Sequence, residues 1–130
     1  MTVKEASKIL GEVLAKESAV ISFNAAKAAF DTDANLSAMM AEYRTARTLL
    51  GELYAKPDAT EEESRSADAL NTRVAELTSA IREDPVYRAL EEAQTAVNEL
   101  MSAVNADLSY YAFGEVPGCT HDCASCSGCH

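Results

Sequence analysis

The 130-residue sequence is poor in the residues that β-rich folds require. It contains 5 Gly, 3 Pro and 6% aromatic residues, whereas sandwiches and barrels use Gly and Pro at their many turns. Strand-like patterns are nearly absent. Ala, Leu, Glu and Ser dominate instead, and this usage is typical of an all-α protein. The length allows one folding unit and a tail.

Long apolar runs are also missing. No segment approaches the roughly 20 apolar residues that a membrane-spanning helix needs. The N-terminal stretch MTVKEASKILGEVL lacks the basic region and the unbroken apolar stretch of a secretory signal. We therefore expect a cytoplasmic protein without a membrane partner.

Positive charge is scarce relative to negative charge. Lys and Arg number 11 against 21 Asp and Glu, and the formal net charge is -10. Such a surface repels phosphate backbones over most of its area. We predict no direct binding of nucleic acid, so that any action on RNA or DNA requires a partner that supplies the positive charge.

The residue groupings that support catalysis are absent from the sequence. It contains no Gly-rich phosphate loop, no Ser/His/Asp set and no metal-binding helix of the His-Glu type. Both histidines, His121 and His130, lie in the C-terminal segment. The protein is therefore predicted not to be an enzyme.

Capping signals mark where helices begin and end. Two capping-box patterns predict helix starts near residues 3 and 60, formed by Thr2 with Glu5 and by Thr60 with Glu63. A helix over roughly 34–55 stops before Pro57, because proline disfavours helical geometry at the residue before it. Asp84 suits an N-cap, and Pro85 suits the first helical position, where a missing N–H has no consequence.

Apolar residues recur along these segments at helical spacing. The first stripe continues past Ser18 either as a second short helix or as the same helix bent. The first three stripes are Ala6, Ile9, Leu10, Val13 and Leu14; Leu36, Met40, Tyr43, Leu50 and Leu53; and Ala67, Leu70, Val74, Leu77 and Ile81. The longest seam extends over about 26 residues, on the order of 40 Å, and consists of Val86, Leu90, Ala93, Val97, Leu100, Val104, Leu108 and Tyr111. We predict an all-α fold: an antiparallel bundle of three to four long helices over residues 1–114, followed by a cysteine-rich metal-binding tail over residues 115–130. Narrow seams bury little surface in a monomer, which favours a homodimer or larger oligomer over a monomeric bundle.

Two sets of side chains outside the seams have alternative interpretations. Four arginines favour helix-surface salt bridges, with a docking surface as the alternative: Arg44, Arg47, Arg82 and Arg88. Three aromatic residues close the last helix, namely Tyr110, Tyr111 and Phe113. Ordinary burial is the simpler prediction for these aromatic residues, and the alternatives are anchoring of the tail or shielding of a metal cluster.

All four cysteines lie in the C-terminal segment CTHDCASCSGCH, with the spacing C-x3-C-x2-C-x2-C. The predicted metal ligands are Cys119, Cys123, Cys126 and Cys129, with His121 and His130 as possible alternative ligands. A compact run of four thiolates fits an iron–sulfur cluster. Zinc is the first alternative, although structural zinc sites commonly pair two knuckles across a longer stretch. Disulfides or free thiols are the second alternative, which a reducing compartment disfavours.

The segment IREDPVYRALEEAQTAVNELMSAVNADLSYYAFG, residues 81–114, resembles the signature helix of the YlbF/YmcA family of bacterial helical regulators. The Asp84-Pro85 start, the seam that follows it and the cysteine tail together carry the resemblance. It extends, less sharply, across about 110 residues.

The resemblance implies an all-helical, oligomerising cytoplasmic protein without enzymatic activity of its own. Cysteine-bearing members carry ligands for [4Fe-4S] clusters within a complex of related proteins and a further partner protein. That complex is linked to endoribonuclease-dependent RNA maturation and to competence, sporulation and biofilm development. The residues that match the cluster-binding tail are Cys119, Cys123, Cys126 and Cys129.

Overall fold

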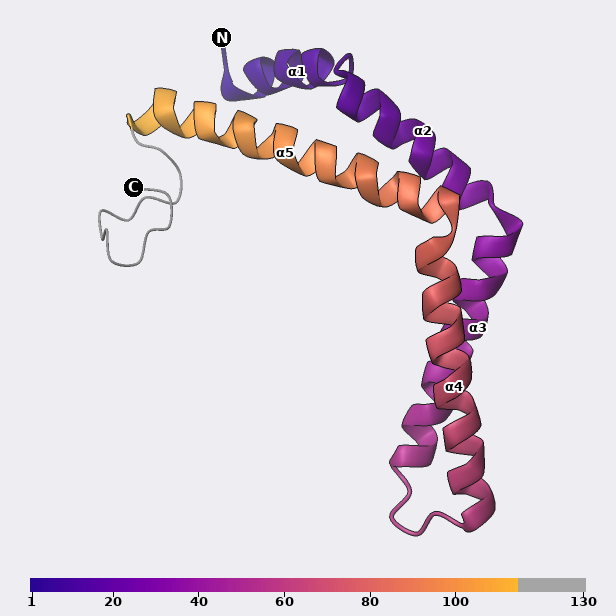
Figure 1. The fold of residues 1–130 in the computed structure, drawn as a ribbon. Coiled ribbons are helices and arrows are strands. Elements are labelled where there is room, and N and C mark those ends of the chain that lie inside the picture. Colours follow the sequence, from indigo (N-terminus) through magenta and orange to yellow (C-terminus); the bar gives the residue numbers. More distant parts are fainter. Residues whose placement is uncertain (115–130) are drawn as a thin grey trace, which may run out of the picture. The chain divides into compact units, whose positions relative to one another are not determined.

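The computed structural model describes residues 1–114, and within them it contains five helices and no strands (Figure 1). The helices are α1 (Val3–Leu14), α2 (Ser18–Thr32), α3 (Ala34–Tyr54), α4 (Glu61–Glu83) and α5 (Pro85–Phe113). The predicted all-α class is therefore confirmed for this part of the chain. The predicted tail, residues 115–130, lies outside the described residues, and its division from a helical domain stays a prediction.

The prediction of three to four helices is too low, because the first apolar stripe is divided between two helices. After Leu14 the N–H groups of Lys16 and Glu17 bond to the carbonyls three residues back, at 3.1 and 3.0 Å. Such i→i−3 bonds tighten and end an α-helix. The chain then begins α2 at Ser18.

The predicted helix starts at Thr2 and Thr60 are confirmed by their hydrogen bonds. The Thr2 hydroxyl accepts from the Glu5 N–H at 3.2 Å, and the Glu5 carboxylate accepts from the Thr2 N–H at 2.6 Å. These bonds complete a capping box, and they lower the pKa of Glu5. The Thr60 hydroxyl likewise accepts from the Glu63 N–H at 3.1 Å.

Both ends of α5 also agree with the prediction. The Asp84 carboxylate accepts from the N–H groups of Val86 and Tyr87 at 2.9 and 3.3 Å, and Pro85 is the first helical residue. At the other end Gly114 has φ +71°, and its N–H donates to the Tyr110 carbonyl at 2.8 Å. Glycine adopts this left-handed conformation without the steric penalty of a side chain.

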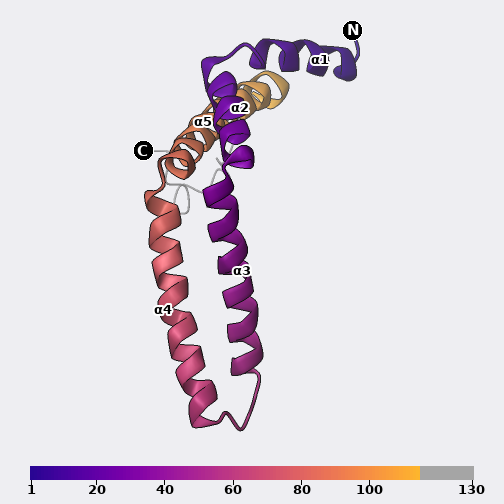
Figure 2. The ribbon, with the colours of Figure 1, turned by 90° about the vertical axis from the view of Figure 1, so that its right-hand side faces the viewer.

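Residues 22–92 form one compact unit, which contains α3 and α4. These two helices lie side by side and antiparallel, joined by residues 55–60 (Figures 1 and 2). Leu36 and Leu77 are fully buried in this unit. The predicted stripes of α3 and α4 supply further buried positions, namely Leu50 and Ala67.

Among the described residues, the second compact unit contains residues 1–21 and 93–114. Of its described helical residues only Ala93 is buried. The predicted α5 seam is half-buried at Val97, Leu100 and Val104 and exposed at Leu108. The terminal aromatic residues Tyr110, Tyr111 and Phe113 are 58%, 84% and 78% exposed. The prediction that these aromatic side chains are buried is therefore wrong.

Candidate functional site

The candidate site lies on the α3–α4 hairpin, whose two helices are joined by an ion pair. The Arg73 guanidinium donates from Nε and Nη2 to the two carboxylate oxygens of Glu42, at 2.6 and 2.9 Å. Arg73 also donates to Glu76, one turn along α4, at 3.2 Å. The hydrogen bond from Arg73 lowers the pKa of Glu42. This two-pronged geometry aligns α4 against α3.

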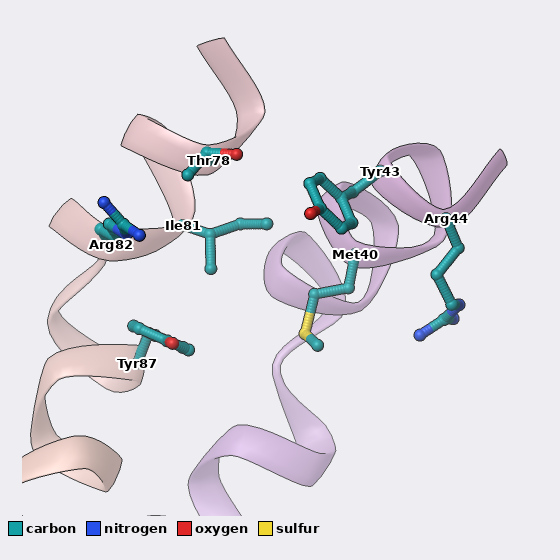
Figure 3. A pocket seen from close by; sticks show the side chains of 7 residues that line it. All are labelled: Met40, Tyr43, Arg44, Thr78, Ile81, Arg82 and Tyr87. Atoms are coloured by element: carbon teal, nitrogen blue, oxygen red, sulfur yellow. The ribbon is translucent and has the colours of Figure 1, made fainter. Parts of the chain in front are cut away.

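A pocket of about 350 Å³ opens between the two helices at the end of α4 and the start of α5. Figure 3 shows Met40, Tyr43 and Ile81 pointing into it from the two helices. The complete lining is Met40, Tyr43, Arg44, Thr78, Ile81, Arg82 and Tyr87. Its floor is therefore apolar and aromatic. Its volume falls at the lower end of the roughly 300–1,000 Å³ typical of ligand pockets.

Two arginines stand at opposite sides of this pocket (Figure 3). Within residues 1–114 neither Arg44 nor Arg82 forms an ion pair with a carboxylate or donates a side-chain hydrogen bond. The same holds in this part of the chain for Arg47 and Arg88, so the expected helix-surface salt bridges are absent at all four arginines. The guanidinium groups of Arg44 and Arg82 are thus available to an acidic ligand.

Tyr87, the first aromatic residue of α5, lines the same pocket. Burial raises the pKa of its hydroxyl, a hydrogen bond with Glu91 raises it further, and the nearby charge of Arg82 lowers it. Its ring contacts Phe30 of α2, with centroids 6.5 Å apart. The Tyr87 hydroxyl is therefore protonated at neutral pH.

A smaller depression of about 190 Å³ lies beside the pocket and shares Met40 and Arg44 with it. Its other lining residues are Phe30, Asp31 and Ser37. The Asp31 carboxylate is paired with Lys27, at 3.1 Å. Arg44 thus borders two hollows, one between α3 and α4 and one between α2 and α3.

The predicted metal ligands are not brought together by any described part of the structure, since all six candidate residues lie outside residues 1–114. These are Cys119, His121, Cys123, Cys126, Cys129 and His130. Within the described residues no group of three or more His, Cys, Asp or Glu side chains is arranged to hold a metal ion. The four thiols stay the predicted ligand set, which lies outside the described residues.

Comparison with known protein families shows which family the chain belongs to, which the helices alone do not show. The family described as "Control of competence regulator ComK, YlbF/YmcA" matches residues 3–110. The chain belongs to the YlbF/YmcA family. No curated protein and no solved structure matches the chain. The resemblance stated from residues 81–114 is thereby confirmed over most of the sequence.

The YlbF/YmcA match identifies this chain's relatives as regulators, and it ends before the first cysteine. The match therefore covers α1 to α4 and α5 up to residue 110, and it leaves the tail outside it. Among residues 1–114, no helix combines the length and the apolar character that crossing a membrane requires.

The pocket on the hairpin of this YlbF/YmcA protein was not predicted as a site. Arg44 and Arg82 belong to different helices and are 38 positions apart by their numbers. The sequence carries one signal for them: neither arginine has an acidic residue three or four positions away on its helix. That signal points to unpaired charge, but it does not show that both charges flank one apolar hollow.

Proposed function

We propose that this chain is a non-enzymatic regulatory adaptor, whose helices bind partner proteins and whose tail binds a metal centre. The match to the YlbF/YmcA regulators over residues 3–110 carries this proposal. The hairpin pocket supports it, because apolar surface flanked by two arginines that form no ion pair within residues 1–114 suits recognition of another protein.

The metal centre in this proposal is a [4Fe-4S] cluster held by Cys119, Cys123, Cys126 and Cys129. Four thiolates are the usual ligand set of such a cluster, so the donor chemistry fits. When bound, the cluster supplies sensitivity to oxygen and to iron supply. Zinc held by the same thiolates, as a structural tie, is the second candidate, since four cysteines also suit tetrahedral zinc.

The proposed partners are a second copy of the chain, related family proteins and a further partner protein. The exposed apolar side chains of α1 and α5 support self-association, since a monomer leaves them in water. Through these partners the chain would modulate competence regulation and endoribonuclease-dependent RNA processing. The net charge of -10 favours action on RNA through a partner over direct contact.

Metal content per chain tests the cluster proposal. After anaerobic purification, iron, acid-labile sulfide and zinc are measured for the full chain and for a chain truncated after Gly118. We expect iron and sulfide in the full chain only. Stoichiometric zinc would support a structural zinc site and contradict the cluster. Absence of all metals would contradict both candidates.

Paired variants of the tail separate the ligands. We expect Cys123→Ser with Cys126→Ser to lose bound iron while the helical circular dichroism is unchanged. The matched control is His121→Ala with His130→Ala, which should keep iron at the level of the parent chain. Loss of iron in the histidine variant would show that imidazole serves as a ligand.

A further inference from the structure

The pocket between α3 and α4 has the composition of a protein-binding surface. Five of its seven lining residues are of the types enriched at protein interfaces, namely Met40, Tyr43, Arg44, Arg82 and Tyr87. None of the seven is Lys, Glu, Asp, Ser or Ala, the types that interfaces contain least. The floor therefore suits apolar anchor side chains of another chain, and the flexible Met40 can adapt to their shape.

The charges at the two sides of the pocket define which ligands it can bind. Five of the 11 Lys and Arg residues form ion pairs within residues 1–114, whereas the two at this pocket form none there. Arg44 and Arg82 lie on opposite sides of the floor (Figure 3). A ligand that spans the pocket thus meets a guanidinium at each side. Carboxylates match this arrangement, because arginine binds them in a two-pronged geometry.

We propose that this pocket binds an amphipathic helix of a partner protein, which presents apolar side chains flanked on both sides by Glu or Asp. A groove between two antiparallel helices is a common seat for such a helix. The inference rests on the adaptor role proposed above and specifies the partner surface that this role needs. It does not involve the cysteine tail.

Fluorescence anisotropy with a defined probe tests this proposal on the full-length chain. The probe is a fluorescein-labelled peptide of Leu, Ala and Glu, about five helical turns long, with Leu at heptad spacing and Glu on both sides of the Leu stripe. Its matched control has Gln at every Glu position. We expect the Glu peptide to bind about tenfold more tightly than the Gln peptide, with binding that weakens as salt rises. Equal binding of the two peptides would overturn the proposal.

Variants of equal charge locate the binding surface. Arg44→Gln with Arg82→Gln should weaken binding of the Glu peptide about fivefold to tenfold. Arg47→Gln with Arg88→Gln removes the same charge outside the pocket and should change it by less than about twofold. Equal losses of affinity in the two double variants would show that net charge alone explains the effect, and would overturn the proposal.

The apolar floor has its own test. Met40→Gln keeps the length of the side chain but makes the floor polar, and it should weaken both peptides about fivefold or more. Thermal unfolding of each variant verifies that the hairpin is intact, and unchanged binding by a folded Met40→Gln chain would overturn the proposal. Sedimentation of the arginine variant identifies the occupant: dissociation of a homo-oligomer would assign the pocket to a second copy instead.

The iron content of the same samples keeps this inference distinct from the cluster proposal. Peptide binding by a chain that holds no metal would support the docking surface and contradict only the cluster. A chain that holds iron but does not discriminate between the two peptides would contradict only the docking surface.

Discussion

The α3–α4 hairpin and helix α1 carry apolar stripes of the same kind, but only the hairpin buries its stripe. Leu36 and Leu77 have 0% and 1% of their surface exposed. In α1, by contrast, no residue is buried, and Val13 is 52% exposed. The end of α5 resembles α1, since Leu108 is 53% exposed.

The difference shows that an apolar stripe is buried only where a second stripe is within reach. Residues 55–60 return the chain so that α4 runs back along α3. The bond from Arg73 to Glu42 then joins the two helices. Exposed apolar surface at α1 and at the end of α5 is the part of the described chain that gains most from a partner.

The largest expected effect is loss of a buried leucine of the hairpin. Leu77→Ala should lower the free energy of unfolding by about 2–5 kcal/mol, because it removes apolar contacts and leaves a cavity. Leu108→Ala, the matched change at an exposed position, should lower it by less than about 0.5 kcal/mol. Urea unfolding followed by circular dichroism measures both, and equal losses would contradict the division between the two regions.

A smaller effect is expected from the cap of α5. Asp84→Ala removes the acceptor for the N–H groups of Val86 and Tyr87 and should lower the free energy of unfolding by about 1 kcal/mol. Thr2→Ala removes the cap of α1, a helix without buried residues, and should fray that helix locally. Amide hydrogen exchange distinguishes the two, since only Asp84→Ala should speed exchange in the hairpin.

The ion pair between Arg73 and Glu42 should make the free energy of unfolding depend on pH in the acidic range. The pKa of Glu42 is lower in the folded chain than its ordinary value of 4.5. Its stabilising contribution is therefore complete above that value and is lost as pH falls through the lowered pKa. Arg73→Gln should flatten the fall in urea midpoint between about pH 5 and pH 3. Arg65→Gln, whose ion pair with Glu61 lies within α4, should keep the parent slope.

The smallest expected effect on unfolding comes from the exposed apolar face of α5, which is part of the surface proposed for self-association. Leu108→Ser with Tyr111→Ser should change the free energy of unfolding of the monomer by less than about 0.5 kcal/mol. If this face joins two copies, the variant should sediment as a monomer at concentrations where the parent chain associates. Unchanged association would assign the contact to another surface.

The helix boundaries were predictable because they depend on neighbours in the sequence. Thr2, Thr60 and Asp84 cap helices through bonds to N–H groups two or three residues away. The division of the first stripe into α1 and α2 was only partly predictable, since residues 15–17 contain neither Gly nor Pro. The four cysteines are predicted as ligands from their local spacing, and this assignment stays a prediction because they lie outside the described residues.

Burial and pairing could not be predicted from the same patterns. Tyr111 and Leu77 both lie on predicted stripes, but one is 84% exposed and the other 1%. Arg73 pairs with Glu42, which is 31 positions away on another helix, as well as with Glu76 on its own helix.

The sequence by itself therefore determined the helical class and the positions of the caps, because short-range hydrogen bonds and spacing specify them, and it predicts the four thiols as ligands. The tertiary structure alone decided which stripe became a core and which arginines flank the pocket. Those outcomes depend on how distant segments meet, because burial requires a second apolar surface and an ion pair requires an opposite charge within reach.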